Sequence, residues 1–226
     1  MGIWERAPAD ESSSHLDKLG SMRLSVVAAE LILSGSLGFA HAQDVTVTAK
    51  DTRPDDSVTQ QFMALDQECR NYVSKRDAEN AVTACKKVSD EADKYDSKTH
   101  PITRRGAYVF YATALIQAQK YQDAVKVGDK AVAVVSMGFD DGSGSNAAYF
   151  VRGQARADAG DLNGADQDLE KAEKFEHDAL NGPAGQDLHG PYSKTLKWEL
   201  MFHAQVLAAM GNKDAAMKKS DEASKL

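Results

Sequence analysis

One stretch of the sequence, residues 146–172 (NAAYFVRGQARADAGDLNGADQDLEKA), constrains the fold more than any other. Apolar and small residues recur in it at helical spacing on both sides of a single break, Gly160-Asp161. Gly160 can adopt the left-handed conformation that ends a helix, and Asp161 can accept hydrogen bonds from the free backbone N–H groups of the next helix. The stretch is therefore predicted to form two helices that fold back on each other as a hairpin.

Small residues lie where the two helices of this hairpin would cross. Gly153 comes seven positions before Gly160 and Ala165 comes five after it, so the two helix axes can approach closely. The remaining contacts are expected from Tyr149, Leu169 and Ala172. This order of an aromatic residue, a small residue, Gly-Asp, Ala, a large residue and Ala resembles a tetratricopeptide repeat. Arg152 and Arg156 depart from the pattern, because the family prefers Leu and Tyr there.

The resemblance implies more hairpins, because a single hairpin of this kind cannot bury its apolar face. Three further segments have the required pattern, namely residues 57–95, 99–135 and 193–226, with breaks predicted at residues 74–77, 119–120 and 211–212. Ser57 and Ser193 are predicted to cap the first and last of these hairpins, and Pro101 suits the first turn of a helix. The expected fold is all-α, a solenoid in which about four antiparallel hairpins form a right-handed superhelix over residues 57–226.

Two segments between the hairpins are predicted to be loops. Residues 137–145 are rich in Gly and Ser, and residues 181–193 (NGPAGQDLHGPYS) contain two Gly-Pro pairs. The second segment is expected to be stiff and non-helical.

The two cysteines support the first hairpin. Cys69 lies eight residues before Asp77 and Cys85 lies eight after it, so a turn at Asp77 places the two side chains opposite each other. In one continuous helix the sixteen intervening steps would hold them about 24 Å apart, well beyond the roughly 7 Å limit for a disulfide. A Cys69–Cys85 disulfide is predicted, and two unpaired core cysteines are the alternative.

The corresponding positions of all four hairpins carry mostly compact residues. The predicted facing pairs are Cys69 with Cys85, Ala112 with Gly128, Gly153 with Leu169, and Ala204 with Ser220. An ordinary helical bundle would not require this agreement, so it favours a repeat.

The beginning of the chain has the features of a secretion signal. Residues 22–42 contain Arg23, a mostly apolar run and Ala40-His41-Ala42, which suits cleavage before Gln43. Residues 1–21 are then a mis-called start, with translation from Met22, or a disordered leader, and residues 43–56 a flexible leader. The alternative is an uncleaved membrane anchor, although the run is short of the ~20 apolar residues that a spanning helix needs. We expect a periplasmic or secreted protein with no stable membrane span after cleavage.

The composition argues against several functions. A net charge of −7 does not suit a nucleic-acid partner, which requires a basic face. No metal or phosphate-binding motif is apparent, so no cofactor and no metal are expected. No pattern typical of a hydrolase occurs either, and the chain is predicted not to be an enzyme. The enzyme alternative rests on His177, His189 and His203, and it would gain if His203 lay beside a buried carboxylate in a closed pocket.

The resemblance implies that the first helix of each hairpin lines a concave peptide-binding surface. The matching positions are Asp66, Arg70, Val109, Thr113, Gln117, Phe150, Gln154, Asp158, Trp198, Met201 and Gln205. This lining is amide-rich with aromatic anchors and lacks the basic cluster that clamps a terminal carboxylate. It therefore suits an extended or helical peptide, or a glycan, better than an acidic tail. Alternatively, Phe150, Trp198 and Met201 simply pack between hairpins.

The leading functional hypothesis is a non-catalytic scaffold that binds a protein or peptide partner. The second hypothesis is a homo-oligomer formed through the exposed side of the last hairpin.

Overall fold

The computed structural model describes residues 56–94, 101–136, 144–182 and 185–226. Within these ranges the chain forms eight α-helices and no strand, which confirms the all-α prediction. The helices are α3 (Asp56–Ser74), α4 (Ala78–Ala92), α5 (Pro101–Gln117), α6 (Tyr121–Ser136), α7 (Ser145–Asp158), α8 (Leu162–Asn181), α9 (Gly185–Ala209) and α10 (Lys213–Ser224). The predicted signal segment, its cleavage site and nearly all of the two leaders lie outside the described residues.

Four tight turns join the helices in pairs, at the four predicted breaks. Each contains one residue with positive φ: Arg76, Gln119, Gly160 and Gly211. In every turn this residue's N–H donates to the carbonyl three residues earlier, and the next N–H donates to the carbonyl five residues earlier. These bonds end one helix with a left-handed residue, and at Gly160 and Gly211 no side chain opposes that conformation. The side chains of Asp77, Asp161 and Asn212 then cap the following helices.

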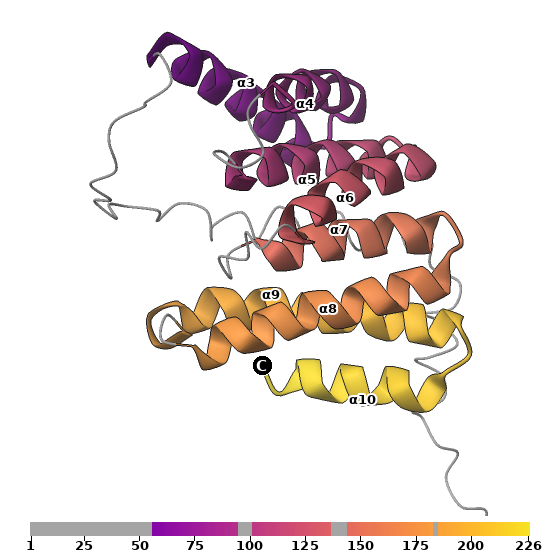
Figure 1. Ribbon diagram of the computed structural model, residues 1–226. Helices are drawn as coiled ribbons and strands as arrows, with labels where there is room; N and C mark the ends of the chain where they lie inside the picture. The colour runs from indigo at the N-terminus through magenta and orange to yellow at the C-terminus, as the bar shows by residue number, and fades with distance from the viewer. Residues whose placement is uncertain (1–55, 95–100, 137–143, 183–184) are drawn as a thin grey trace, which may run out of the picture.

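The helices are stacked in chain order, from α3 at one end to α10 at the other (Figure 1). Each helix packs against its neighbours in the chain, and α5 also contacts α3 and α7. One apolar core extends from α5 to α9, and a second lies between α3, α4 and α5. The first helices of successive hairpins are thus neighbours in space.

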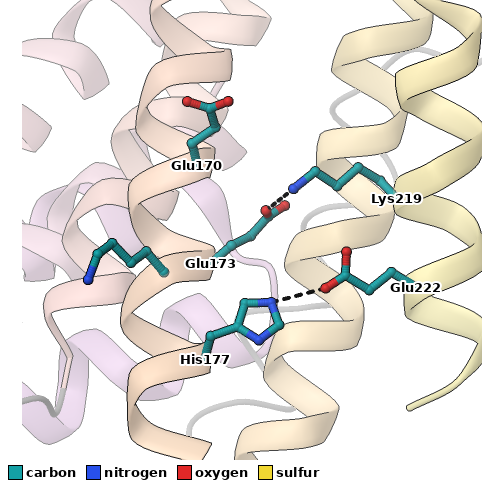
Figure 2. A pocket seen from close by; sticks show the side chains of 6 residues that line it. Glu170, Glu173, His177, Lys219 and Glu222 are labelled. Carbon is teal, nitrogen blue, oxygen red and sulfur yellow. Dashed lines mark hydrogen bonds and ion pairs between the residues drawn. The ribbon is translucent and has the colours of Figure 1, made fainter.

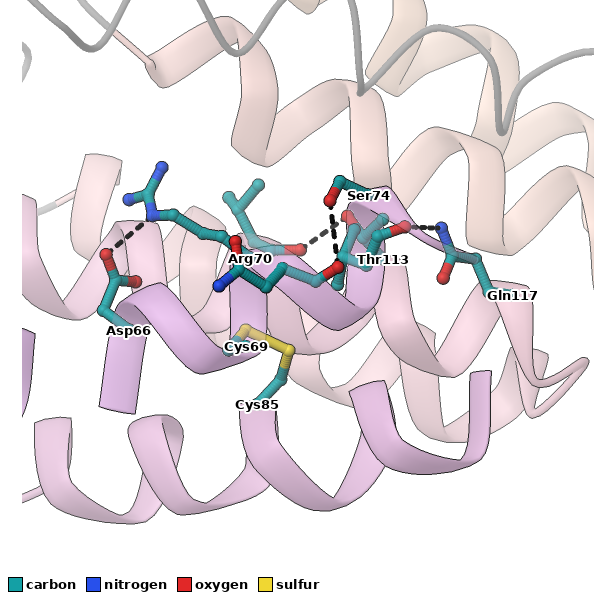
Figure 3. Close-up of a disulfide and its surroundings, with 10 residues drawn as sticks. Asp66, Cys69, Arg70, Ser74, Cys85, Thr113 and Gln117 are labelled. Carbon is teal, nitrogen blue, oxygen red and sulfur yellow. Dashed lines mark hydrogen bonds and ion pairs between the residues drawn. A yellow bond between two sulfur atoms is a disulfide. The ribbon is translucent and has the colours of Figure 1, made fainter. Parts of the chain in front are cut away.

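The predicted disulfide is present between α3 and α4 (Figure 3). Cys69 and Cys85 have no exposed surface, and their Cα atoms are 4.7 Å apart. None of the helices in the described ranges has the length and apolar content that crossing a bilayer requires.

The glycines confirm one close crossing and reveal another. A Cβ atom at Gly153 would lie 3.2 Å from Leu169 Cγ, so this pair faces across the third hairpin as predicted. At Gly128 the nearest atoms belong to Arg152 of α7, and a Cβ atom there would lie 2.9 Å from Arg152 Cβ. Gly128 therefore permits the close approach of two successive hairpins, a role that its predicted pairing with Ala112 did not include.

The predicted loop over residues 181–193 is mostly wrong, because α9 begins at Gly185. Pro191 is the seventh residue of this helix, and Ser193 is buried inside it and caps nothing. Proline lacks the backbone N–H that would bond to the carbonyl four residues earlier, so Pro191 costs this helix one hydrogen bond without ending it. Local propensity is a weak guide to helix boundaries, and here the helix continues through Gly190-Pro191. At the other end of the chain, α3 begins at Asp56, so Ser57 lies in its first turn.

Candidate functional site

The predicted concave-face residues of the first hairpin form an ion pair. Arg70 Nε lies 2.6 Å from Asp66 Oδ2, one helical turn away (Figure 3). The guanidinium carbon of Arg70 also lies 4.1 Å from the centroid of the Phe110 ring on α5. Arg70 therefore joins the first hairpin to the second through a cation–π contact.

The corresponding residues of α5 range from buried to half-buried. Val109 and Thr113 are buried, and the Thr113 hydroxyl donates to the Val109 carbonyl at 2.8 Å. Gln117, the last residue of α5, donates from Nε2 to the carbonyl of Val73 at 3.1 Å. Its Oε1 atom is buried and has no hydrogen-bond partner.

Three predicted residues lie at successive turns of α7. Phe150 packs edge-to-face against Phe202 of α9, with ring centroids 5.7 Å apart. Gln154 has no exposed surface, and neither atom of its side-chain amide has a hydrogen-bond partner. Asp158 ends the helix, and its buried Oδ2 atom is also unpartnered. Burial raises the pKa of the Asp158 carboxyl to about 6.

The last three predicted residues lie on α9. Trp198 is half-buried against the main core, Gln205 is half-buried, and Met201 is exposed. Phe150 and Trp198 therefore pack in the interior, as the alternative interpretation of the sequence held. Gln117, Gln154 and Asp158 differ from these aromatic residues, because each has a buried polar atom without a partner.

Unpartnered polar atoms are concentrated among these predicted residues. In the described part of the chain six buried side-chain oxygen or nitrogen atoms lack a hydrogen-bond partner, and four of them belong to Gln117, Gln154 and Asp158. Buried polar groups in folded proteins are nearly always paired. Three such residues on the first helices of adjacent hairpins are the strongest indication of a ligand that the structure offers.

His203 meets part of the condition set for an enzyme. It is buried, with Nδ1 2.7 Å from Glu173 Oε1 and Nε2 2.6 Å from Asp166 Oδ1, and Lys219 of α10 also bonds Glu173. Burial lowers the pKa of His203, but the bonds to Glu173 and Asp166 outweigh it, and the pKa is raised. For Glu173 burial raises the pKa, and the bonds to His203 and Lys219 bring it below its ordinary value.

The pocket beside this cluster is an open depression of about 320 Å³ between α8 and α10 (Figure 2). Its walls are Glu170, Glu173, Lys174, His177, Lys219 and Glu222. His203 is not among them, and both of its ring nitrogens are engaged by carboxylates. A general base needs a free nitrogen within reach of substrate, so the His203 cluster acts as a link between α8, α9 and α10. In the ranges that the structure describes, no group of His, Cys, Asp and Glu is arranged to hold a metal ion.

A pair of buried acids lies between α8 and α9. The side-chain amide of Asn146 on α7 donates to Glu176 Oε1 and, at 3.2 Å, to Glu199 Oε1. The second oxygen of each carboxyl group is buried and unpartnered. Burial raises the pKa of Glu176 to about 7, while burial and the neighbouring Glu176 raise the pKa of Glu199 well above its ordinary value.

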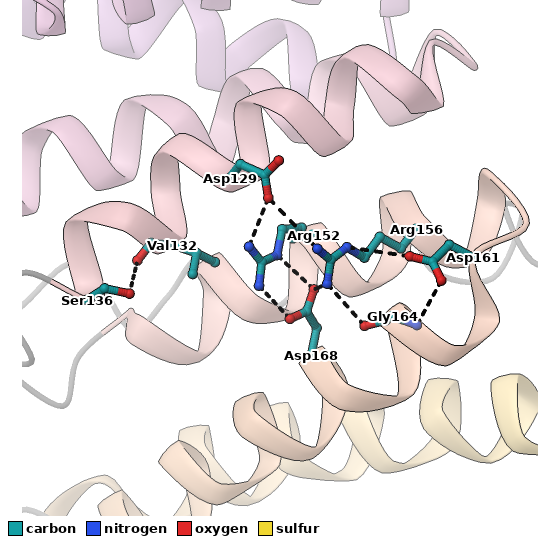
Figure 4. Close-up of polar contacts among 8 residues, drawn as sticks. All are labelled: Asp129, Val132, Ser136, Arg152, Arg156, Asp161, Gly164 and Asp168. Atoms are coloured by element: carbon teal, nitrogen blue, oxygen red, sulfur yellow. Dashed lines mark hydrogen bonds and ion pairs between the residues drawn. The ribbon is translucent and has the colours of Figure 1, made fainter.

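A further network surrounds the two arginines that depart from the repeat pattern (Figure 4). Arg152 binds the buried Asp168 carboxylate through two bonds of 2.8 and 2.7 Å, and Arg156 binds it at 2.8 Å. Arg152 also reaches Asp129 of α6 at 2.9 Å. The sequence contained one signal for this network: Arg152 and Arg156 lie one helical turn apart, where the repeat pattern has Leu and Tyr.

Comparison with known proteins adds no assignment. No family model matches the chain, and neither the curated proteins nor the solved structures include a significant match.

Proposed function

We propose that this protein is an exported, non-catalytic scaffold of the tetratricopeptide-repeat type. Its hairpins form a right-handed superhelix, and the face built by α3, α5, α7 and α9 holds an extended peptide segment of a partner protein. The proposal rests on the unpartnered polar atoms of Gln117, Gln154 and Asp158.

These atoms are costly without a ligand. A buried polar group that lacks its hydrogen bond costs roughly 1–3 kcal/mol. The Gln154 amide offers one donor and one acceptor, the complement of a backbone amide. An extended peptide presents such amides at regular intervals and can satisfy side chains on successive helices. A partner that supplies these hydrogen bonds removes the free-energy cost of the unpaired polar atoms, which favours binding.

Export is supported by the disulfide. Disulfides persist in oxidising compartments and are rare in the cytosol. The Cys69–Cys85 bond agrees with the secretion signal predicted for residues 22–42.

Self-association through the last hairpin has weaker support. The exposed large apolar residues of the last hairpin are Met201, Met210, Met217 and Leu226, and most other exposed residues of α10 are charged or polar. A stable dimer requires a larger apolar core than four partly exposed side chains provide.

The decisive variant is Gln154→Leu. Leucine has a similar volume and carries no polar atom, so it should stabilise the isolated protein and raise its Tm by a few degrees. The same change should weaken binding of a pooled library of fluorescein-labelled nine-residue peptides by about tenfold or more, measured by fluorescence polarisation. A residue with a purely structural role would not combine higher stability with lost binding.

Gln122→Leu, on the exposed side of α6, is the matched control and should leave peptide binding unchanged. The proposal fails if no peptide pool binds the oxidised wild-type protein, or if Gln154→Leu binds as tightly as wild type. Light scattering over a range of concentrations should give one constant mass; a mass that rises with concentration would favour the oligomer.

A further inference from the structure

Asp158 is an isolated carboxyl group at a helix end that attracts positive charge. It is the last residue of α7, and the C-terminal end of a helix carries partial negative charge, which disfavours a carboxylate and favours a cation. Arg156, the basic residue of the last turn, is directed to Asp168 and Asp161. Burial is the sole cause of the raised pKa of Asp158, and within the described residues no cation lowers this pKa.

Gln117 also has an unpartnered oxygen at a helix end, on the neighbouring helix α5. It ends α5 as Asp158 ends α7, the two residues occupy equivalent repeat positions, and α5 packs against α7. The donor of Gln117 is already used by the Val73 carbonyl, so its free atom is an acceptor. Adjacent helix ends therefore present two unpartnered acceptors. One of them belongs to a carboxyl group.

One turn earlier on α7, Gln154 presents a donor and an acceptor together. The three residues thus match a ligand that combines a cationic donor with a polar backbone. We propose that the face formed by α5 and α7 recognises an extended peptide through a basic residue, whose charged group is bound by Asp158 and Gln117 while Gln154 pairs with the adjacent peptide backbone. This inference depends on the proposed peptide-binding function, and it adds the class of peptide.

The charge complementarity gives a pH dependence. The carboxylate form of Asp158 binds the cation, and its pKa is raised to about 6 in the free protein. Affinity for a basic peptide should therefore be highest above pH 6 and fall as the pH drops through about 6, because the cation must displace a proton. The net negative charge of the chain favours the same partner.

The experiment compares three pools of nine-residue peptides that are acetylated and amidated at their ends. The pools are random except at the central position, which is Lys, Gln or Glu. With wild type, the Lys pool should bind about tenfold more tightly than the Gln pool near pH 8, and this preference should shrink near pH 5. A fourth pool with central Gln and a free amino terminus shows whether a terminal amine can supply the cation.

Asp158→Asn keeps the shape of the side chain and removes its charge. It should abolish the preference for Lys over Gln, whereas Asp123→Asn, an equal change of charge on the exposed side of α6, should preserve it. The inference is overturned if wild type binds the Lys and Gln pools equally, or if Asp158→Asn retains the preference. In the first case the proposed function survives provided that Gln154→Leu weakens both pools. Failure of all pools to bind would overturn both proposals.

Discussion

The first hairpin and the pair α8–α9 solve the same packing problem by different chemistry. Between α3 and α4 the buried contacts are mostly apolar, a disulfide crosses the centre, and no charged side chain of residues 60–94 is buried. Across α8 and α9 the buried residues include four acids and a histidine: Asp168, Glu173, Glu176, Glu199 and His203. One pair of helices thus packs around sulfur and methyl groups, and the other packs around acids and a histidine.

The difference determines what each region responds to. A buried charge is tolerated only while its partner is present, and a buried carboxyl group without a cation tends to remain protonated. An apolar contact with a disulfide is indifferent to pH and sensitive to reduction. We therefore expect the stability of the first hairpin, the N-terminal region, to depend on redox conditions. The stability of the pair α8–α9, the C-terminal region, should depend on pH and on the presence of each ion-pair partner.

The largest effect is expected at Asp168. Asp168→Ala leaves Arg152 and Arg156 without their shared carboxylate, and breaking such a buried pair costs about 3–5 kcal/mol. Urea unfolding should show this loss. The control is Asp178→Ala, which removes an exposed pair with Lys174 and should change stability by less than about 1 kcal/mol. If Asp168→Ala and Asp178→Ala lower the free energy of unfolding by the same small amount, the Asp168 network contributes no more to stability than a surface ion pair.

Removal of the disulfide should have the next largest effect. Cys69→Ala with Cys85→Ala opens a loop of about 15 residues and should cost about 3 kcal/mol in the chain-entropy model. Stability in stacked repeats is partly local, so hydrogen exchange should accelerate in α3 and α4 and change little in α8 to α10. Uniform acceleration across all helices would contradict the division of the molecule into two regions.

The positions of the turns could be predicted because they depend on local chemistry. Gly160 and Gly211 favour positive φ, and Asp161 and Asn212 suit the capping positions that follow. The disulfide could be predicted because a hairpin fixes which residues face each other. These features involve residues close in sequence, and all of them were found.

The polar networks could not be predicted because their members are far apart in sequence. Asn146 meets Glu199 across 53 positions, and Lys219 meets Glu173 across 46. The start of α9 was predicted too late because Gly190-Pro191 argues locally against a helix, and the helix nevertheless continues through this pair. For the proposed peptide-binding face, the resemblance to a repeat pointed to Gln154 and Asp158, but only coordinates reveal that their polar atoms lack partners.

Gly128 lies where α6 packs against α7, between the first hairpin and the pair α8–α9. Gly128→Ala would place a methyl group 2.9 Å from Arg152 Cβ and 3.2 Å from its Cα, and Arg152 is held by Asp129 and Asp168. Overpacking of this kind should cost about 2 kcal/mol in thermal unfolding. Gly106→Ala in α5 meets no atom within 4 Å and should gain up to about 1 kcal/mol from helix propensity. Similar shifts for both variants would mean that α6 and α7 separate freely.

The smallest effect expected is the pH dependence of the C-terminal region. The pKa values of Glu176, about 7, and Glu199 are raised, so the contribution of these acids to stability is complete below their ordinary pKa of 4.5 and is lost as the pH rises through about 7. The raised pKa of His203 acts in the same direction, while Glu173, whose pKa is lowered, loses its contribution only at acidic pH.

The free energy of unfolding of wild type, measured in urea, should therefore fall by about 1 kcal/mol or more between pH 5 and pH 8. Glu199→Gln keeps an acceptor for Asn146 and removes one titrating group, so its free energy of unfolding should fall by less than half as much. Glu170→Gln, exposed on α8, should follow the wild-type curve. Because no acid of residues 60–94 is buried, the hydrogen exchange of the first hairpin, corrected for intrinsic rates, should not change over the same pH range. If Glu199→Gln and wild type have the same pH dependence, the acid pair does not hold a proton in the folded protein, and the contrast between the two regions is reduced to the disulfide.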